Sequence, residues 1–86
     1  MSDTKEIYLQ YQIYLAEDDD GFQRLIELKL RKEGFSVKSF SDGNGLLEEI
    51  KNEENKFLVL LDYNLPDING RNLIEKIKNI KNNSEF

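Results

Sequence analysis

Acidic residues gather at two separate points of the chain, each directly after an apolar run. Glu17 and Asp18 follow the apolar residues at 13–16, and Asp62 follows the unbroken apolar run at 57–61. Close carboxylates repel, at a cost of about 4 kcal/mol for two unit charges ~4 Å apart at an effective dielectric near 20. A hard divalent cation relieves this repulsion, and Mg²⁺ suits a small number of carboxylates because it keeps several water positions. The pattern therefore predicts a Mg²⁺ site formed by these three side chains.

The three acids meet only if the surrounding elements place both apolar runs in one sheet. Residues 7–16 alternate apolar and polar side chains with the period of a strand, and the second half of this segment is predicted to be its buried part. The segments at 35–40 and 57–61 are also predicted to be strands, and residues 44–52 a helix. Helical spacing predicts a helix after each strand, with inner faces formed by Phe22, Leu25, Ile26 and Leu30, by Leu46, Leu47 and Ile50, and by Leu73, Ile74, Ile77 and Ile80.

The order β-α-β-α-β-α predicts an α/β fold, with a parallel sheet and helices packed on it. Right-handed crossovers place the second and third strands on opposite sides of the first, which gives the strand order 2-1-3. The carboxyl ends of the first and third strands then flank a topological switch point, where open α/β sheets bind ligands. Asp18 and Asp62 are therefore expected to approach each other although they are far apart in sequence.

Helix capping offers a second explanation for some of the acids. Asp20 is predicted to cap the helix that begins near Gly21, with Gln23 in the position of a capping box, and Gly34 is predicted to end that helix. Asp19 and Asp20 are interpreted as caps rather than as metal ligands. The alternative to a metal site is that all of these acids only cap helices and turn the chain at the surface.

The composition limits the classes of partner. The 86 residues fit one domain, in which residues 1–10 are interpreted as an N-terminal extension and residues 11–86 as the domain itself. The net charge of −5 disfavours binding to nucleic acid or to anionic membranes. No apolar run reaches the ~20 residues of a membrane span, and the sequence contains no cysteine or histidine for thiolate or imidazole chemistry. We therefore expect a cytoplasmic protein that binds cations or basic protein surfaces.

Two segments carry motifs of higher specificity. Residues 14–19 read YLAEDD and precede the helix that contains Phe22, and residues 58–70 read LVLLDYNLPDING. The second segment combines an apolar strand, an Asp, a Pro four positions after it and a Gly eight positions after it. Together these motifs resemble the receiver domains of bacterial response regulators of the chemotaxis-Y type. The resemblance implies that Pro66 and Gly70 shape the loop that follows the third strand.

The resemblance also assigns roles to the acidic residues. It implies that Asp62 is the phosphoryl acceptor and that Asp18 binds Mg²⁺ directly, whereas Glu17 binds it through water. The backbone carbonyl of Asn64 would be a further ligand. An alternative register replaces Glu17 by Asp19 in the acidic pair.

The same resemblance implies a place in a two-component phosphorelay, the signalling system in which response regulators are phosphorylated. A histidine kinase, a phosphotransfer protein or a small phosphodonor would supply the phosphoryl group to Asp62. The domain would not be an enzyme in the usual sense, because it catalyses at most its own modification. Two alternatives are an interaction module or folding fragment that is not phosphorylated, and a phosphatase with an aspartyl nucleophile.

The chain departs from the family in length. The resemblance covers residues 12–81 and implies a three-layer flavodoxin-like domain of five strand–helix pairs, whereas this chain has three. The absent pairs carry a Ser/Thr and a Lys that contact the phosphoryl group, so switching is expected to be impaired. We interpret the chain as the truncated N-terminal part of a receiver domain that stops at Phe86. The strand at 57–61 would then be an exposed apolar edge, and such edges pair with other chains, so we expect self-association through it.

Overall fold

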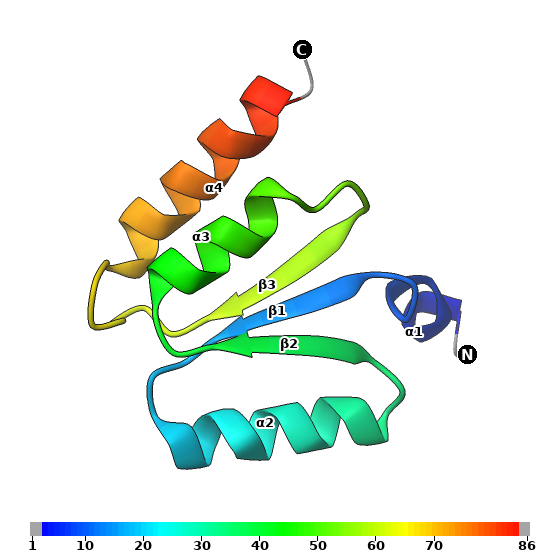
Figure 1. Cartoon of the computed structure of the whole chain (residues 1–86). Coiled ribbons are helices and arrows are strands. Elements are labelled where there is room, and N and C mark those ends of the chain that lie inside the picture. Colours follow the sequence, from blue (N-terminus) through cyan, green and yellow to red (C-terminus); the bar gives the residue numbers. More distant parts are fainter. Residues whose placement is uncertain (1–2, 85–86) are drawn as a thin grey trace.

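The computed structural model describes residues 3–84 and contains one sheet with helices on both of its faces (Figure 1). The three strands are parallel and lie in the order β2-β1-β3. Helix α2 covers one face, and helices α3 and α4 lie over the other. This arrangement confirms the predicted truncated flavodoxin-like fold. In chain order the elements are α1 Asp3–Tyr8, β1 Gln12–Ala16, α2 Asp20–Lys32, β2 Ser36–Phe40, α3 Gly43–Lys51, β3 Phe57–Leu61 and α4 Gly70–Ser84.

The register of the sheet aligns the ends of all three strands. Gln12 at the start of β1 pairs with the first residues of β2 and β3. Ala16 at its end pairs with Phe40 and Leu61, which are the last residues of the two neighbours. Because the strands end at the same level, the residues that follow β1 and β3 lie side by side at the carboxyl ends of the strands.

Alternation along β1 divides the core between the two faces of the sheet. On the α2 face the buried residues are Ile13, Leu15 and Val37, against which Ile26 and Leu30 pack. The buried residues on the opposite face come from the sheet, α3, the β3–α4 loop and α4, and they are Tyr14, Ala16, Leu46, Ile50, Leu65 and Leu73. The central strand is therefore buried on both sides, as expected for a parallel sheet between helical layers.

The first part of the chain differs from the strand predicted for residues 7–16. Ile7 and Tyr8 belong to α1, and β1 begins only at Gln12. The neighbouring strands begin opposite Gln12, at Ser36 and Phe57, so residues further towards the N-terminus have no strand to pair with. Period-two alternation therefore continues beyond the point at which hydrogen-bonding partners are present.

The start of α2 corrects the predicted cap. The N-cap is Asp19 rather than Asp20, and its side chain accepts a hydrogen bond of 2.9 Å from the backbone N–H of Phe22. Asp20 is the first residue of the helix, where its charge suits the helix dipole. Gly34 follows the helix with a φ of 98°, a left-handed conformation that glycine adopts without strain, so the predicted end of the helix is confirmed.

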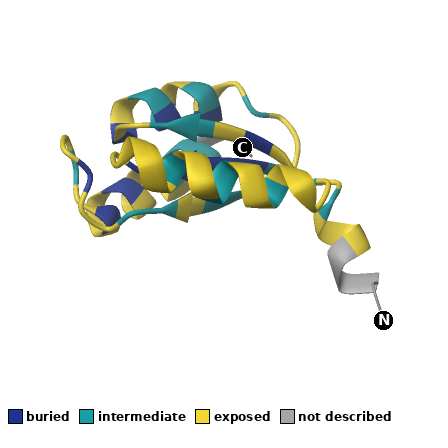
Figure 2. Cartoon of the chain, turned by 90° about the horizontal axis from the view of Figure 1, so that it is seen from below, coloured by how far each residue is buried: buried dark blue, intermediate teal, exposed yellow. Residues whose placement is uncertain are grey.

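Helix α2 buries less of its apolar surface than its sequence predicted. It contains no buried residue, and Phe22, Leu25 and Leu28 are each more than half exposed. In Figure 2, which views the molecule from below, this helix shows only exposed and intermediate residues. Of the predicted stripe, Ile26 and Leu30 contact the sheet cluster. None of the helices in the described part of the chain combines the length and apolarity needed to cross a membrane.

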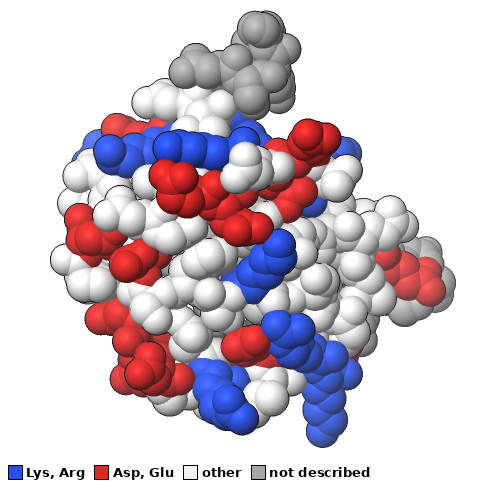
Figure 3. Space-filling model, viewed as in Figure 1, with Lys and Arg blue, Asp and Glu red and all other residues white. Residues whose placement is uncertain are grey.

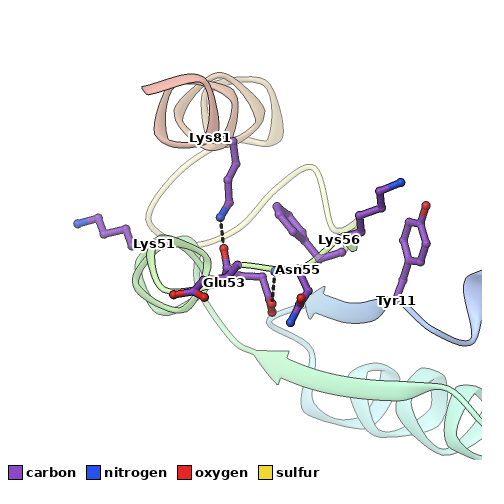
Figure 4. Close-up of a pocket in the computed structure, with 8 residues that line it drawn as sticks. Tyr11, Lys51, Glu53, Asn55, Lys56 and Lys81 are labelled. Atoms are coloured by element: carbon purple, nitrogen blue, oxygen red, sulfur yellow. Dashed lines mark hydrogen bonds between the residues drawn. The ribbon is translucent and has the colours of Figure 1, made fainter. Parts of the chain in front are cut away.

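A polar network closes the core at the amino ends of the strands. Tyr14, which is 1% exposed, donates a hydrogen bond from its hydroxyl to the carboxylate of Glu53. Lys81 of α4 donates to the backbone carbonyl of Glu53, and its ammonium lies 5.3 Å from the centre of the Phe57 ring (Figure 4). The network therefore joins β1, the loop before β3 and the end of α4.

The titration of this network follows from its contacts. Burial raises the pKa of the Tyr14 phenol well above its usual value, and the neighbouring Glu53 carboxylate raises it further. The hydrogen bond from Tyr14 lowers the pKa of Glu53, although burial opposes this shift. A carboxyl group whose folded pKa is depressed stabilises the fold above its unfolded pKa, and this contribution is lost as the pH falls through the folded value.

We expect Tyr14→Phe to lower the free energy of unfolding at pH 7 by about 1–2 kcal/mol, because it removes the hydrogen bond to a charged carboxylate. The difference from the wild type should shrink as the pH falls from the unfolded value of a glutamate, about 4.3, through the lower folded pKa of Glu53. Urea denaturation across this pH range measures both effects. The control is Tyr63→Phe, at a residue that is 58% exposed. Equal losses for the two variants would contradict the role given to the Tyr14–Glu53 hydrogen bond.

Candidate functional site

Three carboxylates meet at the carboxyl ends of β1 and β3. Glu17, Asp18 and Asp62 each offer an oxygen atom, and these three atoms lie within 4.8 Å of one another. Glu17 is buried, Asp62 is partly buried and Asp18 is exposed, so the group opens to solvent on one side. Figure 3 shows further acidic residues along the side of the molecule at which the strand arrows of Figure 1 end.

Backbone hydrogen bonds fix the positions of these acids. The N–H of Glu17 donates to the carbonyl of Phe40 over 3.0 Å, one residue beyond the end of β1. The N–H of Asp62 donates to the carbonyl of Ala16 over 2.8 Å, one residue beyond the end of β3. The backbones of Glu17 and Asp62 therefore continue the hydrogen-bond ladders of the sheet by one residue.

The side chain of Glu17 is also held by the β1–α2 loop. One of its carboxylate oxygens accepts a 3.1 Å hydrogen bond from the backbone N–H of Asp19. The side-chain amide of Gln23 donates to the carbonyl of Glu17 over 2.7 Å and to that of Phe40 over 3.1 Å. Gln23 therefore joins α2 to the ends of β1 and β2, a role that the predicted capping box did not indicate.

The electrostatics of the cluster appear in the titration of Glu17. The N–H of Asp19 favours the charged form of its carboxyl group and lowers the pKa. Burial, the charge and hydrogen bonding of Asp62 and the charge of Asp18 act in the opposite direction. Their sum is larger, so the pKa of Glu17 is raised. The cluster therefore holds negative charge at a cost that a cation would remove.

The loop between β3 and α4, residues 62–69, begins at Asp62 and folds back on itself. The backbone N–H of Asn64 donates to the Asp62 side chain over 3.1 Å. Asn64 and Asn69 form an isolated antiparallel bridge across the loop. Between them the side chain of Leu65 is buried in the core below. The loop is therefore closed at its base and anchored by an apolar side chain.

Gly70 completes the base of this loop. Its N–H donates to the carbonyl of Tyr63 over 2.7 Å. A Cβ at this position would lie 2.8 Å from Tyr63 Cδ1 and 2.9 Å from Leu61 Cδ1, so a larger residue would displace the loop. The role of Gly70 in shaping the loop stays a prediction, which this close packing supports. Pro66 is exposed within the same loop.

The structure places some of the residues predicted from the sequence in one cluster and others beside it. Glu17, Asp18 and Asp62 form one cluster, and Asn64 is attached to it through its hydrogen bond with Asp62. Asp19 lies beside them but caps α2, so the register that would replace Glu17 by Asp19 is not favoured by this geometry.

Sequence reasoning missed a further contact of the β3–α4 loop. Asp67 accepts hydrogen bonds from the first two backbone N–H groups of α3, those of Gly43 and Asn44. Residues this far apart in sequence have no spacing rule that would pair them. The only sequence signal is the Asp that follows Pro66, a combination typical of turns.

The donor set fits a hard divalent cation. All three side chains are carboxylates, the ligand type that Mg²⁺ and Ca²⁺ prefer. The ion pairs formed by the described side chains do not include any of the three, so lysine and arginine do not neutralise the cluster. The open side at Asp18 leaves room for water or a further ligand, which suits Mg²⁺ because it retains several waters.

Comparison with known proteins identifies similar sequences. A family model described as the response regulator receiver domain matches residues 13–85. The transcriptional regulatory protein CssR of Bacillus subtilis (strain 168) is 37% identical over 70 residues. That match covers 81% of this chain but 30% of CssR, so the chain spans less than a third of this relative.

Solved receiver domains share the fold. The receiver domain of the hybrid histidine kinase CckA superposes with a TM-score of 0.75 at 27% identity, over 80% of this chain and 65% of that one. The non-phosphorylated receiver domain of HemR from Leptospira biflexa gives a TM-score of 0.72 at 31% identity, over 85% of this chain and 58% of that one. The fold of this chain is therefore shared with known receiver domains over most of its length.

We expect removal of one acid to stabilise the metal-free protein. At pH 7 in the presence of a chelator, Asp62→Asn should raise the free energy of unfolding by about 1 kcal/mol after solvent screening. A raised carboxyl pKa destabilises the fold increasingly as the pH rises from the unfolded value of about 4.3 through the folded value, so the gain should vanish in acid.

Urea denaturation with and without Mg²⁺ measures this effect. Saturating Mg²⁺ should stabilise the wild type more than Asp62→Asn, because it binds the complete cluster more tightly. Glu54→Gln serves as the control because it removes the same charge far from the cluster. Glu54 lines a surface pocket at the amino ends of the strands, beside Tyr11 and Phe57. A metal-free Asp62→Asn variant that is no more stable than the wild type would contradict the crowding of charge.

Proposed function

Because the chain belongs to the response regulator receiver domain family, we propose that Asp62 accepts a phosphoryl group while Glu17 and Asp18 hold Mg²⁺ beside it. The observation that supports this function best is the convergence of the three carboxylates from β1 and β3. Asp62 is the member of the cluster that begins the β3–α4 loop and is partly exposed, so a phosphodonor can reach it. Asp18 would bind the cation directly and Glu17 through water, with the carbonyl of Asn64 as a further ligand.

The chemistry requires one nucleophile and a good leaving group. A carboxylate oxygen of Asp62 attacks the phosphorus atom in line, and a new O–P bond forms as the bond from phosphorus to the donor breaks. The electron pair of that bond leaves with the donor, either an imidazole nitrogen or the acyl oxygen of acetyl phosphate. Bound Mg²⁺ supplies positive charge to the transferring oxygens. The N–H of Asn64 holds one oxygen of Asp62, which orients the other for attack.

The donor follows from this chemistry. These 86 residues contain no histidine, so a phosphohistidine donor must lie outside them. We assign this role to a histidine kinase or a phosphotransfer protein, as in a two-component phosphorelay.

We expect acetyl phosphate with Mg²⁺ to add one phosphoryl group to the wild type and none to Asp62→Asn. Intact-mass spectrometry measures the modification, and a chelator should abolish it. Asp20→Asn is the matched control, because Asp20 is an exposed acid in the first turn of α2 outside the cluster. It should gain mass as fast as the wild type.

Two results would point to a different function. A wild type that never gains mass and does not bind beryllofluoride would identify an interaction module that keeps the fold without the chemistry. Continuous release of phosphate from unrelated monoesters, lost in Asp62→Asn, would identify a phosphatase.

We further propose that the chain self-associates through β3. This strand is at the edge of the sheet, and its five residues are all apolar. Leu60 points to the α2 face, as the register with Leu15 requires, and is 42% exposed. A second copy that pairs with this edge would satisfy its free backbone groups and cover Leu60, without bringing like charges of the two strands together.

We expect sedimentation to show a concentration-dependent dimer for the wild type. Leu60→Lys should raise the dissociation constant by about tenfold or more, because an unpaired charge is costly to bury. Leu28→Lys is the control, since Leu28 is 54% exposed on α2 rather than on the strand edge. A wild type that stays monomeric at the highest concentration, or equal effects of the two lysines, would refute association through β3.

A further inference from the structure

One side chain attaches the β3–α4 loop to a different layer of the fold. Asp67, in the second half of the loop, accepts a 2.8 Å hydrogen bond from the N–H of Gly43 through Oδ1. Its other oxygen, Oδ2, accepts a 2.9 Å bond from the N–H of Asn44. Both donors are among the first N–H groups of α3, which have no partner within the helix. The loop is therefore attached to α3 by two bonds from one carboxylate.

The helix does not need Asp67 for its local cap. Asp42 is the N-cap of α3 and accepts a 2.8 Å hydrogen bond from the N–H of Gly45. The start of α3 is thus shared between a cap that is adjacent in sequence and a carboxylate that comes from the loop. Removing either acid exposes donors of the same helix, but only the loss of Asp67 detaches the loop.

A close steric contact supports the same attachment. A Cβ built on the buried Gly43 would lie 2.4 Å from Cγ2 of Ile68, the residue after Asp67. That distance is far below van der Waals contact, so a side chain at position 43 would force Ile68 to move. The hydrogen bonds and the apolar contact occur at adjacent residues, and they fix the loop against the helix from two directions.

We propose that Asp67 is a positioning residue, which holds the β3–α4 loop against α3 so that Asp62 and the carbonyl of Asn64 stay in place beside Glu17 and Asp18. This inference rests on the proposed function, because it concerns the geometry of the same cation site. It adds a residue that touches neither the cation nor the phosphoryl group.

The two hydrogen bonds of Asp67 can affect Asp62 because the β3–α4 loop is also restrained before and after Asp67. Asn64 is fixed to Asp62 and bridged to Asn69, so a movement at Asp67 passes to the base of the loop. The N–H of Gly43 lowers the pKa of Asp67, and that of Asn44 adds to this effect although burial opposes it. Asp67 therefore carries its charge at neutral pH, where the positive end of the α3 dipole favours it.

The test compares two acids at the same helix end. Asp67→Asn keeps the size of the side chain but places an N–H₂ group opposite one of the two N–H donors. We expect it to weaken Mg²⁺ affinity and the rate of phosphorylation by acetyl phosphate, each by roughly tenfold, as for other groups that orient metal ligands. NMR titration with Mg²⁺ alone follows the amides of Asp62 and Asn64, and intact-mass spectrometry follows the rate.

Asp42→Ala is the matched control, because it removes the local cap of α3 and leaves the loop attached. It should lower the free energy of unfolding while Mg²⁺ affinity and phosphorylation rate stay within about twofold of the wild type. Gly43→Ala is a second probe, since its methyl group pushes Ile68 away and should reproduce the loss seen with Asp67→Asn. All measurements are made at temperatures where hydrogen exchange shows each variant to be folded.

Each outcome decides the inference. Asp67→Asn with wild-type affinity and rate would overturn the positioning role and leave the function of Asp62 intact, and so would equal losses in Asp42→Ala. If the wild type binds Mg²⁺ but is never phosphorylated, the proposed function fails, and the Mg²⁺ affinities alone decide the role of Asp67. A wild type that binds no Mg²⁺ would overturn both.

Discussion

The repulsion among three carboxylates at the ends of β1 and β3 is the constraint on which the rest of the structure depends. The sheet creates this repulsion, since parallel strands with a common register have their carboxyl ends side by side. It also sustains it, because the backbone bonds of Glu17 and Asp62 continue the ladders past the strand ends. Movement of the Glu17 or Asp62 backbone away from the cluster would cost these hydrogen bonds. The energetically easier response is to recruit a cation.

The electrostatic repulsion among the three carboxylates lowers the stability of the fold, and favourable interactions elsewhere in the protein must offset it. The central strand is buried from Ile13 to Ala16, and α4 is joined to it at the opposite end through Glu53 and Lys81. At the amino ends of the strands, Glu53 and Lys81 each have a hydrogen-bond partner in the network. At the carboxyl ends, Glu17 and Asp62 accept backbone hydrogen bonds, but the ion pairs of the described side chains include none of the three acids. Such a difference between a stabilising end of the sheet and an end with crowded charges is typical of proteins in which a functional site lowers local stability.

Much of the fold could be predicted because its signals are local. The apolar run that ends at Asp62 and the helical spacing around Ile50 and Leu73 each specify an element, and the handedness of crossovers then fixes the order of the strands. Because strand ends coincide in a parallel sheet, the convergence of Asp18 with Asp62 was also predictable.

The failures share one physical cause, which is that they depend on partners distant in sequence. The strand pattern before Gln12 has no neighbouring strand opposite it, and so that segment turns and forms part of a helix. Leu25 lies in the predicted apolar stripe of α2 but is more than half exposed, because burial depends on how the helix lies against the sheet. The contact between Asp67 and Gly43 joins the β3–α4 loop to the start of α3, and it depends on the packing of elements that are far apart in sequence. Sequence periodicity describes one helix or strand at a time, whereas each of these features depends on how two elements pack against each other.

The position of the site also shows which part of the chemistry the three strands can support. The residues proposed as the nucleophile and the cation ligands are Glu17, Asp18, Asp62 and Asn64, and all of them lie in the two loops that follow β1 and β3. In the proposed reaction the cation would neutralise charge on the phosphoryl oxygens as the O–P bond forms. The register that pairs Ala16 with Leu61 places the two loops next to each other, so the proposed attack by Asp62 depends directly on the pairing of β1 with β3.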